Sequence, residues 1–255
     1  NMLPQSPMNM EAGGKLNLRN PKHEPARMIE IIPAIIPQSL EDLRSTLDTM
    51  HHLAPLVQID ITDGMFVLSQ SWPMRTQDKK SFEALVRKKE TLPFSDEFKF
   101  EIDIMAHSPE KIIAAWVPLG IARAVFHLKS KHDFSEIKRA GGDALELGVA
   151  IDRDPPYEKL ATYIPHIDYV QVMGIATLGR QGEPFDPRAL TVIKRVQSDF
   201  PNVTIQVDGG VNDRSAPHLI AAGATRLIAG SYIIKSEDPK GAIETLKNIE
   251  PCTQV

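Results

Sequence analysis

Three aspartates, Asp60, Asp103 and Asp208, lie in or directly after short runs of aliphatic residues. A carboxylate can exchange a proton with a substrate carbon or bind a divalent cation. Asp103 lies between Ile102 and Ile104, so in an extended strand its side chain points to the face opposite theirs. Buried carboxylates are costly unless they are paired, share a proton or bind a metal. If the three converge, the sequence therefore predicts a divalent metal ion among them.

The alternative for each aspartate is structural, because an aspartate can cap the following helix or pair with a nearby lysine or arginine. For one aspartate that alternative is favoured, whereas three at the same end of a sheet favour a functional cluster. Asp63 is different. It is followed by Gly64, and Asp-Gly after a strand indicates a turn.

The elements that must position these aspartates alternate along the chain between short β-branched runs and longer amphipathic ones. Strands are expected over residues 31–36, 56–61, 98–105, 123–128, 145–151, 169–173, 204–207 and 226–229. Helix starts are expected at Ser39, Ser108-Pro109, Asp186-Pro187 and Asp238-Pro239. Strand–helix units in this number, with no glycine fingerprint after the first strand, predict a single (β/α)8 TIM barrel rather than an open doubly wound sheet.

The composition excludes several classes of protein. The chain has 255 residues and a formal net charge of -4, which provides no basic surface for nucleic acid. No apolar run reaches the roughly 18 residues that span a membrane, and a single cysteine, Cys252, excludes a disulfide scaffold. We expect a cytoplasmic protein with a flexible leader over residues 1–27, the barrel over 28–250 and a tail over 251–255.

Glycine-containing turns follow the last two expected strands, at Gly209-Gly210 and at Gly230-Ser231. In (β/α)8 barrels the backbone N–H groups of these two loops commonly bind phosphate, together with the N-terminus of a short helix. Glycine leaves the backbone open to an approaching anion. The sequence therefore predicts a phosphate site at these four residues.

Six motifs occur in a specific order and spacing. They are Ile32-Pro33-Ala34-Ile35, Ile59-Asp60-Ile61-Thr62-Asp63-Gly64-Met65-Phe66-Val67, Asp103-Ile104-Met105, Val172-Met173, Val207-Asp208-Gly209-Gly210-Val211-Asn212 and Ala229-Gly230-Ser231. From about Met28 to Lys247 the chain thus resembles the ribulose-phosphate 3-epimerase family. The resemblance implies a homo-oligomer acting on a phosphorylated ketopentose. It also implies that Asp60 and Asp208 exchange the C3 proton from opposite faces through an enediolate, whose oxygens a metal holds.

The chain departs from the family pattern at the metal ligands. The family uses two histidines and two aspartates, and its histidines fall on Gln58 and Asp103 here. The serine typical of the family's first strand falls on Ala34, a pocket-lining position. The set Gln58, Asp60, Asp103 and Asp208 offers only oxygen, which suits Mg²⁺ or Mn²⁺ better than Zn²⁺ or Fe²⁺.

Further pocket residues follow from the same resemblance. Met105 and Met173 match methionines that line the family's pocket. The loop after the sixth strand replaces the family's Asn-Pro-Gly-Phe-Gly-Gly pattern, but it keeps Gly179 and Gly182 and adds Arg180, which could contact the phosphate.

Two alternatives to an epimerase stay open. A non-catalytic or differently specific phosphosugar-binding barrel would keep the glycine turns around a degenerate metal site. A phosphosugar aldolase or decarboxylase of a related barrel would place a lysine beside an aspartate on the third strand. Here Lys99 lies two residues before Glu101, so no lysine lies beside Asp103.

Three histidines receive structural interpretations. His127, near the end of the fourth expected strand, is expected to be packed or hydrogen-bonded, with a role as ligand or acid/base as the alternative. His51 and His52 follow an expected helix, where an imidazole suits the carbonyl groups of the last turn.

Overall fold

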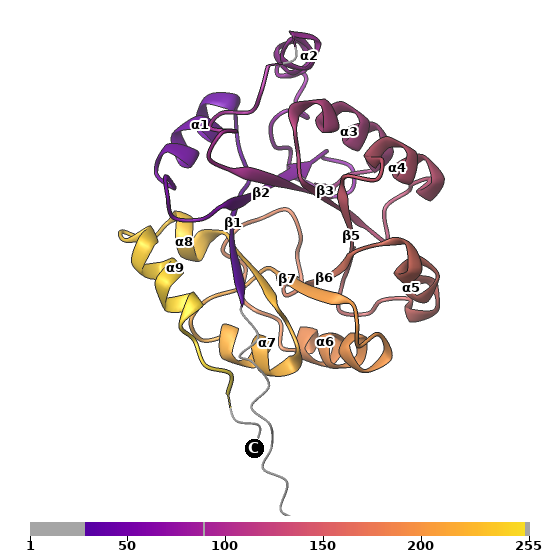
Figure 1. Ribbon diagram of the computed structural model, residues 1–255, viewed down its shortest axis with the longest axis vertical. Coiled ribbons are helices and arrows are strands. Elements are labelled where there is room, and N and C mark those ends of the chain that lie inside the picture. Colours follow the sequence, from indigo (N-terminus) through magenta and orange to yellow (C-terminus); the bar gives the residue numbers. More distant parts are fainter. Residues whose placement is uncertain (1–28, 89, 253–255) are drawn as a thin grey trace, which may run out of the picture.

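Eight parallel strands hydrogen-bond in sequence order, and β8 pairs with β1 to close a barrel (Figure 1). The computed structural model describes residues 29–88 and 90–252. The strands are β1 (Glu30–Ile35), β2 (Leu56–Thr62), β3 (Lys99–Met105), β4 (Arg123–His127), β5 (Glu146–Ile151), β6 (Tyr169–Met173), β7 (Thr204–Asp208) and β8 (Arg226–Ala229). The predicted (β/α)8 fold is confirmed.

The helices form a ring outside the strands (Figure 1). They are α1 (Leu40–Asp48), α2 (Lys79–Lys88), α3 (Pro109–Trp116), α4 (Phe134–Gly141), α5 (Tyr157–Tyr163), α6 (Arg188–Asp199), α7 (Ala216–Ala222), α8 (Ser231–Ile234) and α9 (Pro239–Lys247), with 3₁₀ turns η1 (Val117–Leu119) and η2 (Ile164–His166). Within the described residues, none of them has the length and apolar character needed to cross a membrane.

Side-chain caps explain two of the expected helix starts. Ser39 caps α1 by accepting a hydrogen bond from the Asp42 N–H, and Asp238 caps α9 in the same way for Gly241. Helix α3 begins at Pro109 as expected, but Ser108 has φ 53 and makes no side-chain cap. Since proline at the first helical position lacks an N–H, α3 begins with one donor fewer to satisfy.

Strand alternation separates an apolar outer face from an interior that contains buried polar side chains as well as apolar ones. In β2, Ile59 and Ile61 belong to the apolar layer between strands and helices, whereas Gln58 and Asp60 hydrogen-bond inside the barrel. Both faces of a parallel barrel strand are covered, so all seven residues of β2 are buried.

A polar chain runs through the interior below the mouth. The Nε2 group of Gln206 donates to Glu101 Oε1 at 2.5 Å and to Gln171 Oε1 at 2.8 Å, and Gln171 Nε2 donates to Asp103 Oδ2 at 2.8 Å. These side chains are fully buried. The second oxygen of Glu101 has no hydrogen-bond partner and lies 3.9 Å from Arg123 Nη1.

The buried carboxyl group of Glu101 should make the stability of the protein depend on pH. Burial raises the pKa of Glu101 from 4.5 to about 7, so the native protein binds this proton more tightly than the unfolded chain. The resulting stabilisation is present below pH 4.5 and is lost as the pH rises through 7. Glu101→Gln has no such component. The free energy of unfolding of wild type minus that of the variant should therefore fall by roughly 2–3 kcal/mol between pH 5 and pH 8.

Urea unfolding of both proteins at the two pH values measures this change. Shifts of carboxylates distant from Glu101 cancel in the difference, since both proteins contain them. Asp60 and Asp208 contribute a smaller change, because the charge of Glu101 is a minor cause of their raised pKa values. An equal difference at pH 5 and pH 8 would show that Glu101 titrates at the same pH in the native and the unfolded protein.

The predicted leader over 1–27 lies outside the described residues, as do residues 253–255 of the predicted tail. These boundaries stay predictions. In the described part of that tail, the Cys252 N–H donates to the Pro217 carbonyl at 3.2 Å.

Candidate active site

Asp60, Asp103 and Asp208 converge from β2, β3 and β7 toward the carboxyl ends of the strands. One carboxylate oxygen of each lies within 4.8 Å of the others. The register between β2 and β3 places Asp60 directly beside Asp103. All three side chains are buried, with Asp208 the most accessible at 9%. The structure thus contains the cluster that strand alternation predicts.

Gln58 holds two of these carboxylates from below. Its Nε2 donates to Asp60 Oδ1 at 2.9 Å and to Asp208 Oδ2 at 3.2 Å, while its Oε1 is buried without a hydrogen-bond partner. The sequence predicts an amide oxygen as metal ligand, but the structure turns the amide nitrogen toward the carboxylates. Without a cation, an N–H₂ group is what stabilises two neighbouring carboxylates. Rotating the amide by half a turn would present the unpartnered oxygen instead.

Two side chains hold Asp103, one at each of its carboxylate oxygens. His127 Nε2 lies 3.0 Å from Oδ1, and Gln171 Nε2 donates to Oδ2 at 2.8 Å. His127 is hydrogen-bonded, as expected. No lysine or arginine pairs with Asp103 in the described residues, so the structural alternative does not explain it. Gln171 is absent from the sequence prediction, although its place between two valines of a strand is a detectable signal of an inward polar residue.

The surroundings of the cluster favour the protonated forms of its carboxyl groups. Burial, and then the negative charges of Asp208 and Asp103, raise the pKa of Asp60 well above its usual value. Burial and Asp103 raise the pKa of Asp208 in the same way. A cation among the carboxylates would reverse this effect by favouring the ionised forms. With one carboxyl protonated and one ionised, such a pair can both donate and accept a proton.

The donor set fits a hard divalent cation. The three carboxylates supply oxygen atoms within 4.8 Å of one another, and a half-turn of the Gln58 amide would add its unpartnered oxygen as a fourth. Oxygen ligands of this kind suit Mg²⁺ or Mn²⁺. The identity of the metal stays a prediction.

A cavity of about 300 Å³ opens above the cluster. Its lining contains Ala34, Asp60, Met105, Met173, Gly179, Arg180, Gly182, Asp208, Gly209, Gly210, Gly230 and Ser231. These are all the residues that the sequence predicts for proton transfer, phosphate binding and the pocket wall. The two remaining predicted ligands, Gln58 and Asp103, are fully buried and not part of the lining. The structure brings the predicted residues together, and their individual roles stay predictions.

The glycines at the mouth have structural causes. Gly209 and Gly210 have φ values of 102 and 68, and a Cβ on Gly210 would lie 2.6 Å from the Phe185 Cα. Only glycine fits such a conformation so close to another backbone. This requirement exists without any anion. The short helix α8, whose N-cap is Gly230, provides the separate feature that favours a phosphate site here.

Two contacts that the sequence does not predict hold the loop after β6 over the mouth. Gln181 Nε2 donates to the Ala34 carbonyl at 2.8 Å, and Ser69 Oγ donates to the Gly179 carbonyl at 2.7 Å. Each joins segments more than 100 residues apart, 147 in the first case and 110 in the second. No local pattern could have indicated them.

Asp63 stabilises a turn, as expected. Its Oδ1 accepts the N–H groups of Met65 and Phe66 at 2.8 and 2.7 Å. Its Oδ2 accepts the His107 N–H at 2.9 Å and so joins the loops after β2 and β3.

Comparison with known proteins decides the family. The model of the ribulose-phosphate 3 epimerase family matches residues 30–234, which is most of the barrel. The chain belongs to the ribulose-phosphate 3-epimerase family. The resemblance inferred from the sequence motifs is confirmed.

Curated members of the ribulose-phosphate 3-epimerase family support this placement over most of the chain. The ribulose-phosphate 3-epimerase of Bacillus subtilis is 28% identical over 227 residues, which cover 86% of this chain and 99% of the relative. That of Eremothecium gossypii is 27% identical over 198 residues, covering 76% and 81%. Among solved structures, 3-hexulose-6-phosphate synthase from Salmonella typhimurium superimposes with a TM-score of 0.61 at 14% identity, covering 86% of this chain and 97% of that one. At that identity the structural likeness supports the fold alone.

Proposed function

We propose that this protein interconverts ribulose 5-phosphate and xylulose 5-phosphate by proton exchange at C3. The observation that carries the proposal is the pair Asp60 and Asp208, two buried carboxylates held by one amide group at the floor of a cavity. Epimerisation at a carbon next to a carbonyl needs one base to remove the proton and one acid to return it from the other side. The family to which the chain belongs supports this choice of reaction.

Each side chain around the cavity floor has a separate role in the proposed reaction. The ionised member of the pair takes the C3 proton, and the protonated member donates to the opposite face. Gln58 orients both carboxyl groups through its Nε2 hydrogen bonds. His127 and Gln171 fix Asp103 beside them. A divalent cation bound by the three carboxylates, with the Gln58 amide rotated so that its oxygen replaces the Nε2 hydrogen bonds, would supply positive charge. This charge would lower the cost of negative charge on the substrate oxygens.

The phosphate group of the substrate would bind at the part of the cavity formed by the loops after β7 and β8. The loops that contain Gly209-Gly210 and Gly230-Ser231 line this part, and α8 begins there. Arg180 lies at the rim with an exposed side chain. An arginine can bind a phosphate through two parallel hydrogen bonds.

Arg180→Ala is expected to raise KM for the phosphorylated substrate about tenfold, because one charge-assisted hydrogen bond to the phosphate is lost. The value of kcat should stay close to that of wild type, since Arg180 is not among the proton-transfer residues. Steady-state kinetics measure both constants. Arg44→Ala, an exposed arginine on α1, is the matched control. An unchanged KM in Arg180→Ala would assign the phosphate to the backbone donors alone.

The proposed reaction is tested by a coupled assay with ribulose 5-phosphate in the presence of Mg²⁺, Mn²⁺, Fe²⁺ or Zn²⁺. In D₂O the product should carry deuterium at C3, because the returning proton comes from a carboxyl group that exchanges with solvent. A folded sample without turnover in any of these metals contradicts the proposal. If phosphorylated ligands then still raised the melting temperature, a non-catalytic phosphosugar-binding barrel would be the better assignment.

Two further predictions concern the state of the protein in the cell. A homo-oligomer is expected from the family resemblance, and light scattering of the purified chain measures it. A cytoplasmic location is expected from the sequence, and cell fractionation tests it.

A further inference from the structure

A second group of metal-binding side chains lies at the end of the barrel opposite the mouth. His51 and His52 follow α1 and precede β2, and Glu97 precedes β3. Since the strands are parallel, both loops lie at the amino ends of the strands. One ligand atom of each of the three residues lies within 4.8 Å of the others.

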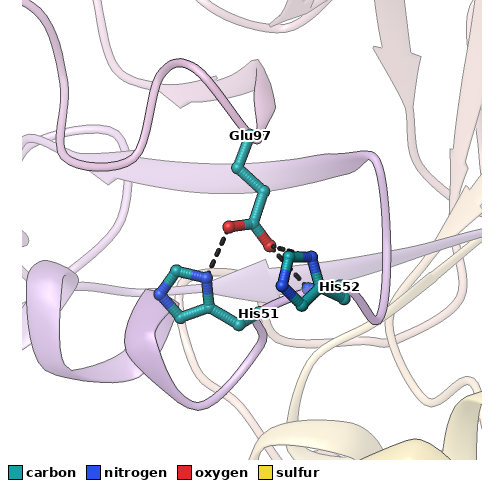
Figure 2. A group of neighbouring side chains, drawn as sticks. All are labelled: His51, His52 and Glu97. Atoms are coloured by element: carbon teal, nitrogen blue, oxygen red, sulfur yellow. Dashed lines mark hydrogen bonds and ion pairs between the residues drawn. The ribbon is translucent and has the colours of Figure 1, made fainter.

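The two imidazole rings face one carboxylate (Figure 2). His51 Nδ1 is hydrogen-bonded to Glu97 Oε2, and His52 Nδ1 lies 3.4 Å from Glu97 Oε1. The ring centroids are 5.7 Å apart. Two nitrogen atoms and one carboxylate thus point to one place, where a cation could contact all three.

Neighbouring groups orient these ligands. The far nitrogen of His51, Nε2, lies 3.5 Å from Asp48 Oδ1. If a metal occupied Nδ1, the neutral ring would carry its proton on Nε2, where the Asp48 carboxylate can accept it. The backbone N–H of His52 donates to Glu97 Oε1 at 2.5 Å and so fixes the carboxylate. The ring of His51 also packs edge-on against Phe94, with centroids 4.6 Å apart.

The backbone around the group is held in an uncommon conformation. His52 has φ 60 and Phe94 has φ 57, and these are two of the three non-glycine residues with positive φ in the described parts of the chain. Left-handed backbone is unfavourable for such side chains and persists where surrounding contacts hold it. Here it presents His52 to Glu97 and Phe94 to His51.

The sequence predicts that these two imidazoles bind carbonyl groups at the end of α1, and the structure does not show this. The carbonyls of Thr46 and Leu47, in the last turn of α1, already accept backbone N–H groups, and so does that of Met50 in the turn that follows. Both imidazoles instead face the carboxylate of Glu97. The physical reason is that backbone turns after α1 satisfy those carbonyls first, so the rings are free to turn away.

We infer that His51, His52 and Glu97 form a binding site for a borderline divalent transition-metal ion of the Zn²⁺ class. Imidazole nitrogen with one carboxylate oxygen is a donor set that suits Zn²⁺ and is avoided by Mg²⁺ and Ca²⁺. The site differs in chemistry from the all-oxygen cluster at the mouth. Binding would join the end of α1 to the segment before β3, and so stabilise the base of the barrel. The inference does not depend on the proposed reaction.

Isothermal titration with ZnCl₂ at pH 7.5 tests the inference, with excess Mg²⁺ present to occupy oxygen ligands at the mouth. Wild type should bind one Zn²⁺ that His52→Ala binds at least about tenfold more weakly, since even indirect partners of a metal contribute that much. The side chain of His52 is 87% exposed, so its removal leaves the packing intact. His166→Ala, an exposed histidine on η2, is the matched control.

Two further measurements complete the test. Zn²⁺ should raise the melting temperature of wild type and of His166→Ala but not that of His52→Ala or of Glu97→Gln. Epimerase activity with Mg²⁺ should be the same in wild type and His52→Ala. Equal Zn²⁺ stoichiometry and affinity in wild type, His52→Ala and Glu97→Gln would overturn the inference and leave Glu97 as a hydrogen-bonding partner of the two histidines only.

Discussion

Asp208→Asn is expected to lower kcat for epimerisation by about 10³- to 10⁴-fold, since the asparagine amide can neither accept nor return the C3 proton. The substitution keeps the shape of the side chain and an oxygen for the hydrogen bond from Gln58 Nε2. It also removes one of three negative groups that repel one another in a buried cluster. The free energy of unfolding should therefore be equal to or higher than that of wild type.

This combination of lost activity and retained stability distinguishes a proton-transfer residue from a structural one. Activity is measured in the coupled assay, stability by urea unfolding, and phosphate binding by the effect of inorganic phosphate on the melting temperature, which should be unchanged. Asp199→Asn, at the exposed end of α6, is the matched carboxylate control. Full activity in Asp208→Asn would exclude the two-carboxylate mechanism.

Removal of divalent metal is expected to reduce activity by about 100-fold or more, because several kcal/mol of charge stabilisation on the substrate oxygens are lost. Incubation with EDTA followed by gel filtration prepares the metal-free protein, and Mg²⁺ or Mn²⁺ should restore turnover. These two ions are expected to be effective because the three carboxylates, and Gln58 after a half-turn of its amide, offer only oxygen ligands.

Asp103→Asn separates this metal from the proton-transfer pair. The variant should need a metal concentration about 10- to 100-fold higher for half-maximal activity, while approaching wild-type kcat at saturation. His52→Ala, which alters the distant histidine group, should need no more metal than wild type. Full activity of the metal-free protein would instead indicate that a shared proton, stabilised by Gln58, replaces the cation at the mouth.

The expected strand ranges agree with the structure to within one residue at each end, for a clear physical reason. Alternation with period two depends only on neighbouring residues, so Asp60 between Ile59 and Ile61 is enough to place its carboxylate inside. Helix starts at Ser39, Pro109 and Asp238 depend on interactions within one turn.

Local sequence patterns do not predict contacts between distant segments. Gln58 contacts Asp208 from 150 residues away, and which end of its amide faces the carboxylates depends on that neighbour. The contact between Gln181 and Ala34 exists only because the loop after β6 crosses the mouth. The facing of His51 and His52 toward Glu97 likewise depends on how two loops pack.

The sequence by itself determined the barrel, its family and the residues that meet at the mouth, because periodicity, turn chemistry and motif order are properties of short segments. The tertiary structure alone decided which atoms face one another. It turned the Gln58 nitrogen to Asp60 and Asp208, placed His127 and Gln171 on Asp103, and set two histidines against Glu97 at the opposite end. Hydrogen bonds extend only about 3 Å, so these pairings depend on how the closed barrel brings distant segments together.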